Sequence, residues 1–179
     1  GDGFQDKTHQ TVEISCPGSV KEIQGEEEKE LEPGSMVSVT TGDGSCSAQR
    51  LILEPETGTE LTVTSLNRSQ GHPSYAGRLE ILDTEEGLVL VNELPLEDYL
   101  KKVVPSEMPA SYEKEALKAQ AVCARTYAYM QMKSNSYRSY GAQIDDSTQF
   151  QVYKNVETDA KTTQAVQETY GKMLYYDGN

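Results

Sequence analysis

The sequence predicts an α+β protein, in which a β-rich N-terminal part packs beside an α-rich second part. Short segments of alternating apolar residues fill the first half of the chain, whereas helical apolar spacing and many alanines follow Pro95. The charge is uneven, because residues 1–98 hold 20 Asp and Glu against 6 Lys and Arg, and residues 99–179 hold 9 against 10. A chain of 179 residues is long enough for one large or two small cores.

Six short segments predict strands, at residues 11–15, 36–40, 50–54, 60–66, 78–82 and 88–92. Val12 and Ile14 alternate on one face of the first, as Val37 and Val39 do in the second. The last two segments resemble a hairpin around residues 83–87. The charged run GEEEKELEPG, residues 25–34, predicts a solvated loop. Residues 1–10 predict a disordered tail or a remnant of cloning, and residues 11–74 an acidic β-rich domain.

Three helices are predicted after Pro95. A short amphipathic helix covers residues 96–104 and ends at Pro105, because proline lacks a backbone N–H and its ring clashes with the preceding turn. A long, alanine-rich helix covers about residues 112–133, with Ser111 as its N-cap. A third covers about residues 160–170, with Asp159 at its start and Gly171 as its stop. Residues 172–176 suggest the beginning of a strand.

Glu107 is the carboxylate that this pattern singles out. It lies between Pro105 and Pro109, which restrict the backbone on both sides of it. We expect it in a turn beside the N-terminus of the long helix. Such a fixed position is typical of a group with a chemical role, whereas most loop glutamates are solvated.

Lys114, Lys118 and Arg125 fall on one stripe of the long helix. Two interpretations of Lys118 and Arg125 stay open: contact with a substrate, or a salt-bridge network that stabilises the core. Arg125 has small neighbours, Ala124 and Thr126, which indicates close packing around it.

The composition bounds the partners. The acidic first half argues against nucleic acid. Ten of the eleven tyrosines lie from Tyr99 onward. Tyrosine combines a flat apolar face with a hydroxyl and suits sugar rings and interfaces, although core packing is its commoner use. The sequence indicates no cofactor, and no apolar run is long enough to cross a membrane.

The three cysteines and two histidines, His9 and His72, lack the spacing of a zinc site, so no metal is predicted. Cys16 and Cys46 lie in loop-like sequence and would pair as a disulfide in an extracytoplasmic protein. Two free thiols are the alternative. Cys123, among the alanines of the long helix, is expected to be a small buried residue.

Three blocks of the second half, in order, resemble the SpoIID/LytB domain: LVNELPLEDYLKKVVPSEMPASYEKEALKAQAVCARTYA, DDSTQFQVYKN and ETDAKTTQAVQETYGKML. Three ordered blocks are more specific than one short motif. The resemblance covers about residues 75–179 and implies a catalytic core there, with residues 11–74 as an accessory domain. Because the family continues past the position of Asn179, the core is expected to be incomplete at its C-terminus.

The resemblance implies which residues form the site. The catalytic glutamate of the family's SEMP motif corresponds to Glu107, and Lys118 and Arg125 match its basic positions. Some relatives carry Cys and His in or near the second block, which lines the cleft, and bind zinc, whereas this chain has neither residue there. The remaining substrate-binding or supporting candidates are Ser106, Asp146, Ser147, Thr148, Gln151 and Tyr153. For residues 146–148 the alternative is simple turn chemistry, and for Gln151 and Tyr153 it is packing.

The resemblance implies a lytic transglycosylase, which cleaves the N-acetylmuramic acid–N-acetylglucosamine bond of denuded peptidoglycan strands to 1,6-anhydro products. One carboxyl suffices for this reaction, whereas glycoside hydrolysis usually needs two. Asp98 and Asp146 are the candidates for a second. LytB-type relatives are described as amidase enhancers, so a non-catalytic module that binds the wall or an amidase is the alternative. An acidic structural domain that docks a partner is a third.

The family's setting implies a protein that faces the cell wall outside the cytoplasm or is anchored to the membrane. Its expected partners are glycan strands, a wall amidase and membrane-anchored sporulation proteins. Glu107 must hold a proton before it donates one. We therefore expect Val104, Met108 and nearby tyrosines to shield it from water. Lys118 and Arg125 should then contact substrate or residues 146–148, without a tight ion pair to Glu107.

Overall fold

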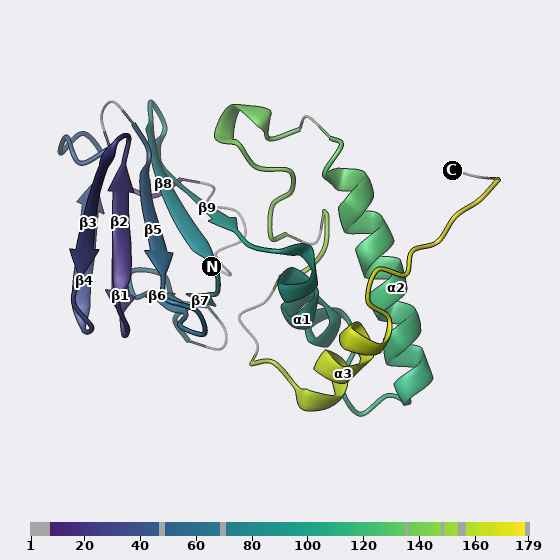
Figure 1. Cartoon of the computed structure of the whole chain (residues 1–179). Helices are drawn as coiled ribbons and strands as arrows, with labels where there is room; N and C mark the ends of the chain where they lie inside the picture. The colour runs from purple at the N-terminus through teal and green to yellow at the C-terminus, as the bar shows by residue number, and fades with distance from the viewer. Residues whose placement is uncertain are drawn as a thin grey trace. The chain divides into compact units, whose positions relative to one another are not determined.

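The α+β class is confirmed by a computed structural model, which describes residues 8–46, 49–68, 71–134, 136–147, 149–153 and 157–177. The chain forms two compact units, Gly1–Leu94 and Pro95–Asn179 (Figure 1). All the strands described lie in the first unit and all the helices in the second. The first unit includes residues 75–94, which the sequence analysis grouped with the catalytic core.

The first unit consists of two antiparallel sheets (Figure 1). One has the strand order β4-β1-β6-β7 and the other β3-β2-β5-β8-β9. The strands are β1 (Thr11–Cys16), β2 (Val20–Gln24), β3 (Glu27–Leu31), β4 (Ser35–Thr40), β5 (Leu51–Pro55), β6 (Leu61–Val63), β7 (Ser74–Tyr75), β8 (Arg78–Thr84) and β9 (Gly87–Glu93).

The predicted alternation of apolar residues forms the core of this unit. Val12 and Ile14 of β1 are fully buried and pair with Val39 and Val37 of β4. The second sheet adds the inward side chains of β5 and β8, among them Leu53. Side chains on a strand alternate between its two faces, so each sheet presents one apolar face to a shared core.

A hairpin replaces the loop predicted at residues 25–34. Strands β2 and β3 pair antiparallel around a two-residue turn, and Gly25 in that turn has a φ of 63°, which suits glycine. Lys21 and Glu28 form a cross-strand ion pair of 3.4 Å between Nζ and Oε2. The side chains of β3 before Leu31 are exposed. The edge strand β3 therefore lacks the apolar alternation that predicts a strand from sequence.

The predicted hairpin of β8 and β9 is confirmed, with a tighter turn in which Thr84 pairs with Gly87. The predicted tail is wrong in part, because His9 forms a β-bridge with Leu88 through backbone hydrogen bonds of 2.9 and 2.7 Å. Residues 1–7 of that predicted tail lie outside the described residues.

The second unit contains α1 (Leu96–Glu107), α2 (Lys114–Gln131), a 3₁₀ turn η1 (Arg138–Tyr140) and α3 (Ala160–Glu168). Helix α2 packs against both other helices. Its buried face includes Ala121, Ala124 and Ala128, whose small side chains allow close approach. The helix is thus central in this unit, as its alanines predict.

Three details of the helical unit differ from the prediction. Pro105 does not end α1, which includes it and continues to Glu107. The N-cap of α2 is Glu113, not Ser111, and its side chain makes no capping hydrogen bond. Residues 172–176 form no strand. The start of α3 is confirmed, because the Asp159 carboxylate accepts hydrogen bonds from the backbone N–H groups of residues 161 and 162.

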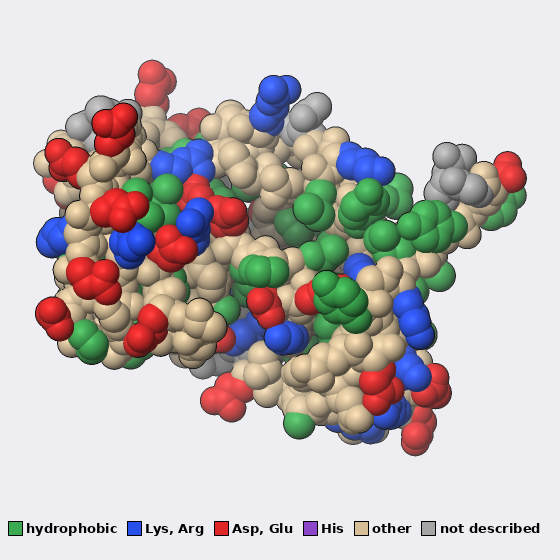
Figure 2. Space-filling view, in the orientation of Figure 1, with side chains coloured by type: hydrophobic (Ala, Val, Ile, Leu, Met, Phe, Trp, Pro, Cys, Tyr) green, Lys and Arg blue, Asp and Glu red, His purple; other side chains and the backbone are tan. Residues whose placement is uncertain are grey.

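Large apolar side chains are exposed on the second unit (Figure 2). They come from the C-terminal half of α2, as Tyr129 and Met130, and from the segment after α3, as Leu174 and Tyr176. The backbone N–H of Leu174 donates to Thr126 Oγ1 at 2.9 Å, which ties this segment to α2. No helix in the described part of the chain is both long and apolar enough to span a bilayer.

The shared core of the first unit makes a testable prediction. We expect Ile14→Ala to lower the free energy of unfolding of this unit by about 2–5 kcal/mol, because it removes a fully buried side chain and leaves a cavity. Urea unfolding followed by circular dichroism measures this. Met36→Ala is the matched control, since Met36 is 57% exposed on the neighbouring strand. Equal effects of the two substitutions would contradict the predicted packing.

Candidate functional site

Glu107 is the last residue of α1 and its side chain is exposed. Its Oε1 accepts a hydrogen bond of 2.8 Å from the backbone N–H of Val152. The expected turn beside the N-terminus of the long helix is wrong, because α2 begins only at Lys114. The carboxylate lies instead at the C-terminal end of α1, which is the negative end of that helix's macrodipole. Val104 and Met108 do not shield it from water in this chain.

A side-chain hydrogen bond stabilises a local turn at residues 145–147. Asp145 accepts hydrogen bonds from the backbone N–H of Ser147 at 2.9 Å and from the Tyr137 hydroxyl at 2.6 Å. Ser147 Oγ in turn accepts from the N–H of Gln149 at 3.2 Å. The alternative of local turn chemistry therefore describes Ser147. Asp146 is half-buried, and Thr148 lies outside the described residues.

Gln151 and Tyr153 are buried on either side of Val152. Gln151 Nε2 donates to the backbone carbonyl of Ala124 at 3.2 Å, and its Oε1 accepts from the Tyr99 hydroxyl at 3.3 Å. The rings of Tyr99 and Tyr153 stack with centroids 5.3 Å apart and planes within 3°. Both side chains therefore pack inside the unit.

Tyr99 is a half-buried tyrosine of α1 whose hydroxyl contacts Gln151. Burial raises the pKa of Tyr99 well above its usual value, and the neighbours Tyr153 and Tyr127 raise it further. The charges of Glu107 and Asp146 contribute the smallest increases, in the same direction. Sequence reasoning missed Tyr99 as part of the site, because its place on the apolar face of a helix predicts only packing.

Asp98 does not share a site with Glu107. The two residues are nine positions apart on α1, which is two and a half turns and about 13 Å along the axis. Their side chains leave the helix on opposite faces. Asp98 instead pairs with Lys101 at 2.7 Å. Asp146 is the remaining candidate for a second carboxyl group.

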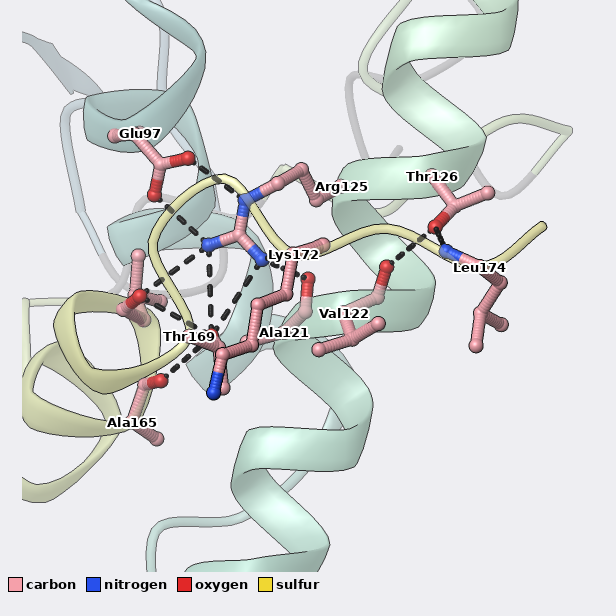
Figure 3. Close-up of polar contacts among 10 residues, drawn as sticks. Glu97, Ala121, Val122, Arg125, Thr126, Ala165, Thr169, Lys172 and Leu174 are labelled. Carbon is pink, nitrogen blue, oxygen red and sulfur yellow. Dashed lines mark hydrogen bonds and ion pairs between the residues drawn. The ribbon is translucent and has the colours of Figure 1, made fainter.

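Arg125 is a buried anchor, with a side chain only 2% exposed (Figure 3). Its Nε and Nη2 donate to the two carboxylate oxygens of Glu97 at 2.7 and 2.8 Å. Nη2 also donates to the carbonyl of Val166 at 3.2 Å, and Nη1 to that of Lys172 at 3.1 Å. The guanidinium thereby joins α2 to α1, α3 and the segment that follows. This geometry favours the core-stabilising interpretation of Arg125 over substrate contact.

Lys118 lies nearer the start of α2 and joins it to α3. Its Nζ is 2.9 Å from Glu115 Oε1 and 3.7 Å from Glu168 Oε2. The hydrogen bond to Glu115 raises the pKa of Lys118, and burial opposes this rise. Lys114 also pairs with Glu168 at 2.5 Å. The two basic candidates of this helix thus contact Glu97, Glu115 and Glu168, and residues 146–147 are not their partners.

Ser106 precedes Glu107 in the last turn of α1. Its Oγ donates to the carbonyl of Lys102 at 2.6 Å, within the helix. A hydroxyl used in this way satisfies a backbone acceptor of its own helix. The contact fits a supporting role more closely than a substrate-binding one.

The structure does not contain the predicted disulfide between Cys16 and Cys46. Cys16 and Cys46 are buried free thiols, and burial is the main cause that raises the pKa of each. Cys16 pairs with Ser35 at one end of the β1–β4 ladder, whereas Cys46 follows the turn beyond Thr40 at its other end. Cys123 is exposed, so its predicted burial is wrong.

No group of three or more His, Cys, Asp and Glu side chains suited to a metal ion occurs among the residues that the structure describes. An exposed carboxyl group held by a backbone N–H, as at Glu107, is of the chemical type used in general acid–base catalysis.

Comparison with known proteins identifies one family and several relatives that match part of the chain. A family described as "Stage II sporulation protein" (SpoIID) matches residues 84–176. Stage II sporulation protein D of Bacillus subtilis is 45% identical over 101 residues, which cover 49% of this chain and 29% of that protein. An amidase enhancer of the same species is 46% identical over 80 residues, 45% of this chain and 10% of the enhancer.

An uncharacterized protein of Brachyspira hyodysenteriae is 39% identical over 105 residues, 58% of this chain and 28% of that protein. The chain thus spans less than a third of the length of each of these relatives. No solved structure matches the chain.

The buried contacts of Arg125 predict that removing its side chain destabilises the helical unit. We expect Arg125→Ala to lower the free energy of unfolding of the helical unit by about 3 kcal/mol or more, because Glu97 and two carbonyls lose a buried donor. Urea unfolding followed by helical circular dichroism measures this. Lys118→Ala, on the same helix but in a solvated pair, should leave the midpoint nearly unchanged. Equal midpoints for the two variants would show that Arg125 is no anchor.

Proposed function

The chain belongs to the stage II sporulation protein (SpoIID) family, and on that premise we propose that it is a peptidoglycan lytic transglycosylase with Glu107 as its acid and base. The substrate is a glycan strand stripped of stem peptides, cut between N-acetylmuramic acid and N-acetylglucosamine. The observation that carries this proposal is the placement of Glu107. An exposed carboxyl group ends a helix and is oriented by a backbone amide from a separate segment.

One carboxyl group performs both proton transfers of this reaction. Protonated Glu107 donates its proton to the glycosidic oxygen as the bond to C1 of the muramic acid breaks. The resulting carboxylate then takes the proton of that sugar's C6 hydroxyl while the hydroxyl oxygen attacks C1. The products are a 1,6-anhydro end and a free N-acetylglucosamine end, and Glu107 is protonated again. No water enters, so no second carboxyl group is required.

The positions of the other carboxyl groups support this mechanism over hydrolysis. Asp98 lies on the opposite face of α1 from Glu107 and about 13 Å along it, beyond the separations used by retaining or inverting glycosidases. In the proposed reaction Asp146 binds sugar hydroxyls rather than activating water.

The charge of the second half suits this substrate. A denuded strand still carries the lactyl carboxylate of each muramic acid, so it is anionic. The helical unit, Pro95–Asn179, is nearly neutral, with 10 Lys and Arg against 11 Asp and Glu, whereas residues 1–94 hold 6 against 18. The helical unit therefore repels the strand far less than the β-rich unit would.

The same substrate sets the location and the partners. Peptidoglycan lies outside the cytoplasm, so we place the protein there, facing the wall or anchored to the membrane. Enzymes that strip stem peptides, such as a wall amidase, would supply the strands that it cuts. Membrane-anchored sporulation proteins are further proposed partners.

A second candidate function is a non-catalytic module that binds the wall or an amidase. The 46% identity to an amidase enhancer favours it. The exposure of Glu107 favours it as well, since a general acid works best where water is excluded. The two candidates differ in what becomes of a bound glycan strand.

Digestion of denuded glycan strands distinguishes them. We expect the full-length natural protein to release 1,6-anhydro products that mass spectrometry identifies by their mass, one water below that of hydrolysis products. Glu107→Gln should lower the rate by about 10²-fold or more, because the amide holds no transferable proton. Glu113→Gln, which removes the same charge from an exposed position, should cleave at the wild-type rate. Strands retained but uncut by wild type and Glu107→Gln alike would establish the binding module instead.

A further inference from the structure

The backbone amide of Val152 is held in place from both sides. Gln151 before it and Tyr153 after it are 6% exposed each, whereas Val152 itself is only half-buried. Gln151 bonds to the Ala124 carbonyl of α2 and to the Tyr99 hydroxyl of α1. Tyr153 stacks on the Tyr99 ring. Residues 151–153 form a short irregular segment. Because the side chains before and after Val152 are buried and contact the helices, the backbone amide of Val152 has little freedom to move.

Gln151 and Tyr153 both contact α1 at one residue, Tyr99. Tyr99 and Glu107 lie on the same helix, eight residues or about 12 Å apart along its axis. A helix is rigid over that length, so the position of residues 151–153 on Tyr99 also fixes their position relative to Glu107. The hydrogen bond of 2.8 Å between Val152 N–H and Glu107 Oε1 closes this loop of contacts.

We propose that Tyr99 and Gln151 are positioning residues for Glu107, which act by holding the Val152 amide on its Oε1. The bond fixes the carboxyl group in one rotamer and occupies one oxygen. The other oxygen, Oε2, has no hydrogen-bond donor among the described residues, and it is the atom that exchanges the proton with the glycosidic oxygen and the C6 hydroxyl. The catalytic part of this inference rests on the proposed function, and the hydrogen bond does not.

The contacts distinguish positioning from plain packing. Packing requires only the stacked rings and the buried volume of Gln151. Positioning requires in addition the two hydrogen bonds of Gln151, since these fix the segment along the helices. Gln151→Met keeps the length and most of the volume of the side chain but removes both bonds. Tyr99→Phe keeps the stacked ring and removes one.

The test observes the Val152 amide in the ¹⁵N-labelled 179-residue chain by NMR. We expect its hydrogen exchange to be about tenfold faster in Gln151→Met, because loss of the held geometry weakens the bond to Glu107. Its proton chemical shift should vary with pH as Glu107 ionises, and this variation should vanish in Glu107→Gln and shrink in Gln151→Met. Tyr99→Phe should show a smaller change of the same kind. The exposed controls Gln167→Met and Tyr170→Phe should behave like wild type.

Cleavage of denuded strands by the same variants separates this proposal from the proposed function. Wild-type exchange and pH response of the amide in a folded Gln151→Met would overturn the positioning role. If Gln151→Met does not fold, Tyr99→Phe with wild-type amide behaviour does the same. Altered amide behaviour in a protein whose wild type cuts no strands supports positioning and rejects the enzyme. Altered amide behaviour with an unchanged kcat overturns the catalytic part alone.

Discussion

The helical unit depends on the ion pair between Arg125 and Glu97. Glu97 lies in the first turn of α1, and Arg125 presents both of its forked donors to the two carboxylate oxygens from the middle of α2. The remaining guanidinium contacts reach the end of α3 and Lys172. A buried pair of this kind contributes less net stability than its Coulomb energy suggests, because both ions lose water. Arg125 also contacts α1, α3 and the segment after α3 at once, so its contacts help to orient the three helices relative to one another.

The arrangement of the helices also fixes the position of Glu107, because α1 is continuous. Pro105 stands third from the end of the helix and lacks the N–H that would bond to the carbonyl of residue 101. The helix nevertheless continues, since Val103 and Val104 are fully buried and the Met108 N–H bonds to the Val104 carbonyl at 2.9 Å. Fixing the first turn through Glu97 therefore fixes the last residue. The chemical group stands on a helix end, which is a more rigid support than the predicted turn.

The sequence predicts what local pattern controls and misses what distant partners decide. Alternation in β1 and β4 and the alanines of α2 each predict a buried face, and those faces are found. Strand β3 escapes prediction because an exposed edge strand needs no apolar alternation. Pro105 misleads because its local cost, about 3 kcal/mol in a helix interior, is offset by tertiary packing. The motif singles out Glu107, but nothing local pairs Arg125 with a glutamate 28 residues away.

The two proposed roles differ in whether water reaches Glu107 when a glycan strand is bound. The side chain of Glu107 is exposed to solvent. A general acid toward a glycosidic oxygen gains from a site without water, where its interactions are stronger. In the enzyme, that exclusion has to come from the glycan strand or from protein that covers Glu107 only when a strand is bound. A binding module needs no such cover. The hydrogen bond from the Val152 amide is compatible with both the enzyme and the binding module. It orients Oε1 of Glu107 and leaves the opposite side of the carboxyl group open to a ligand. The covering of Glu107 in the bound state, more than its identity, is therefore the physical difference between cutting a strand and holding it.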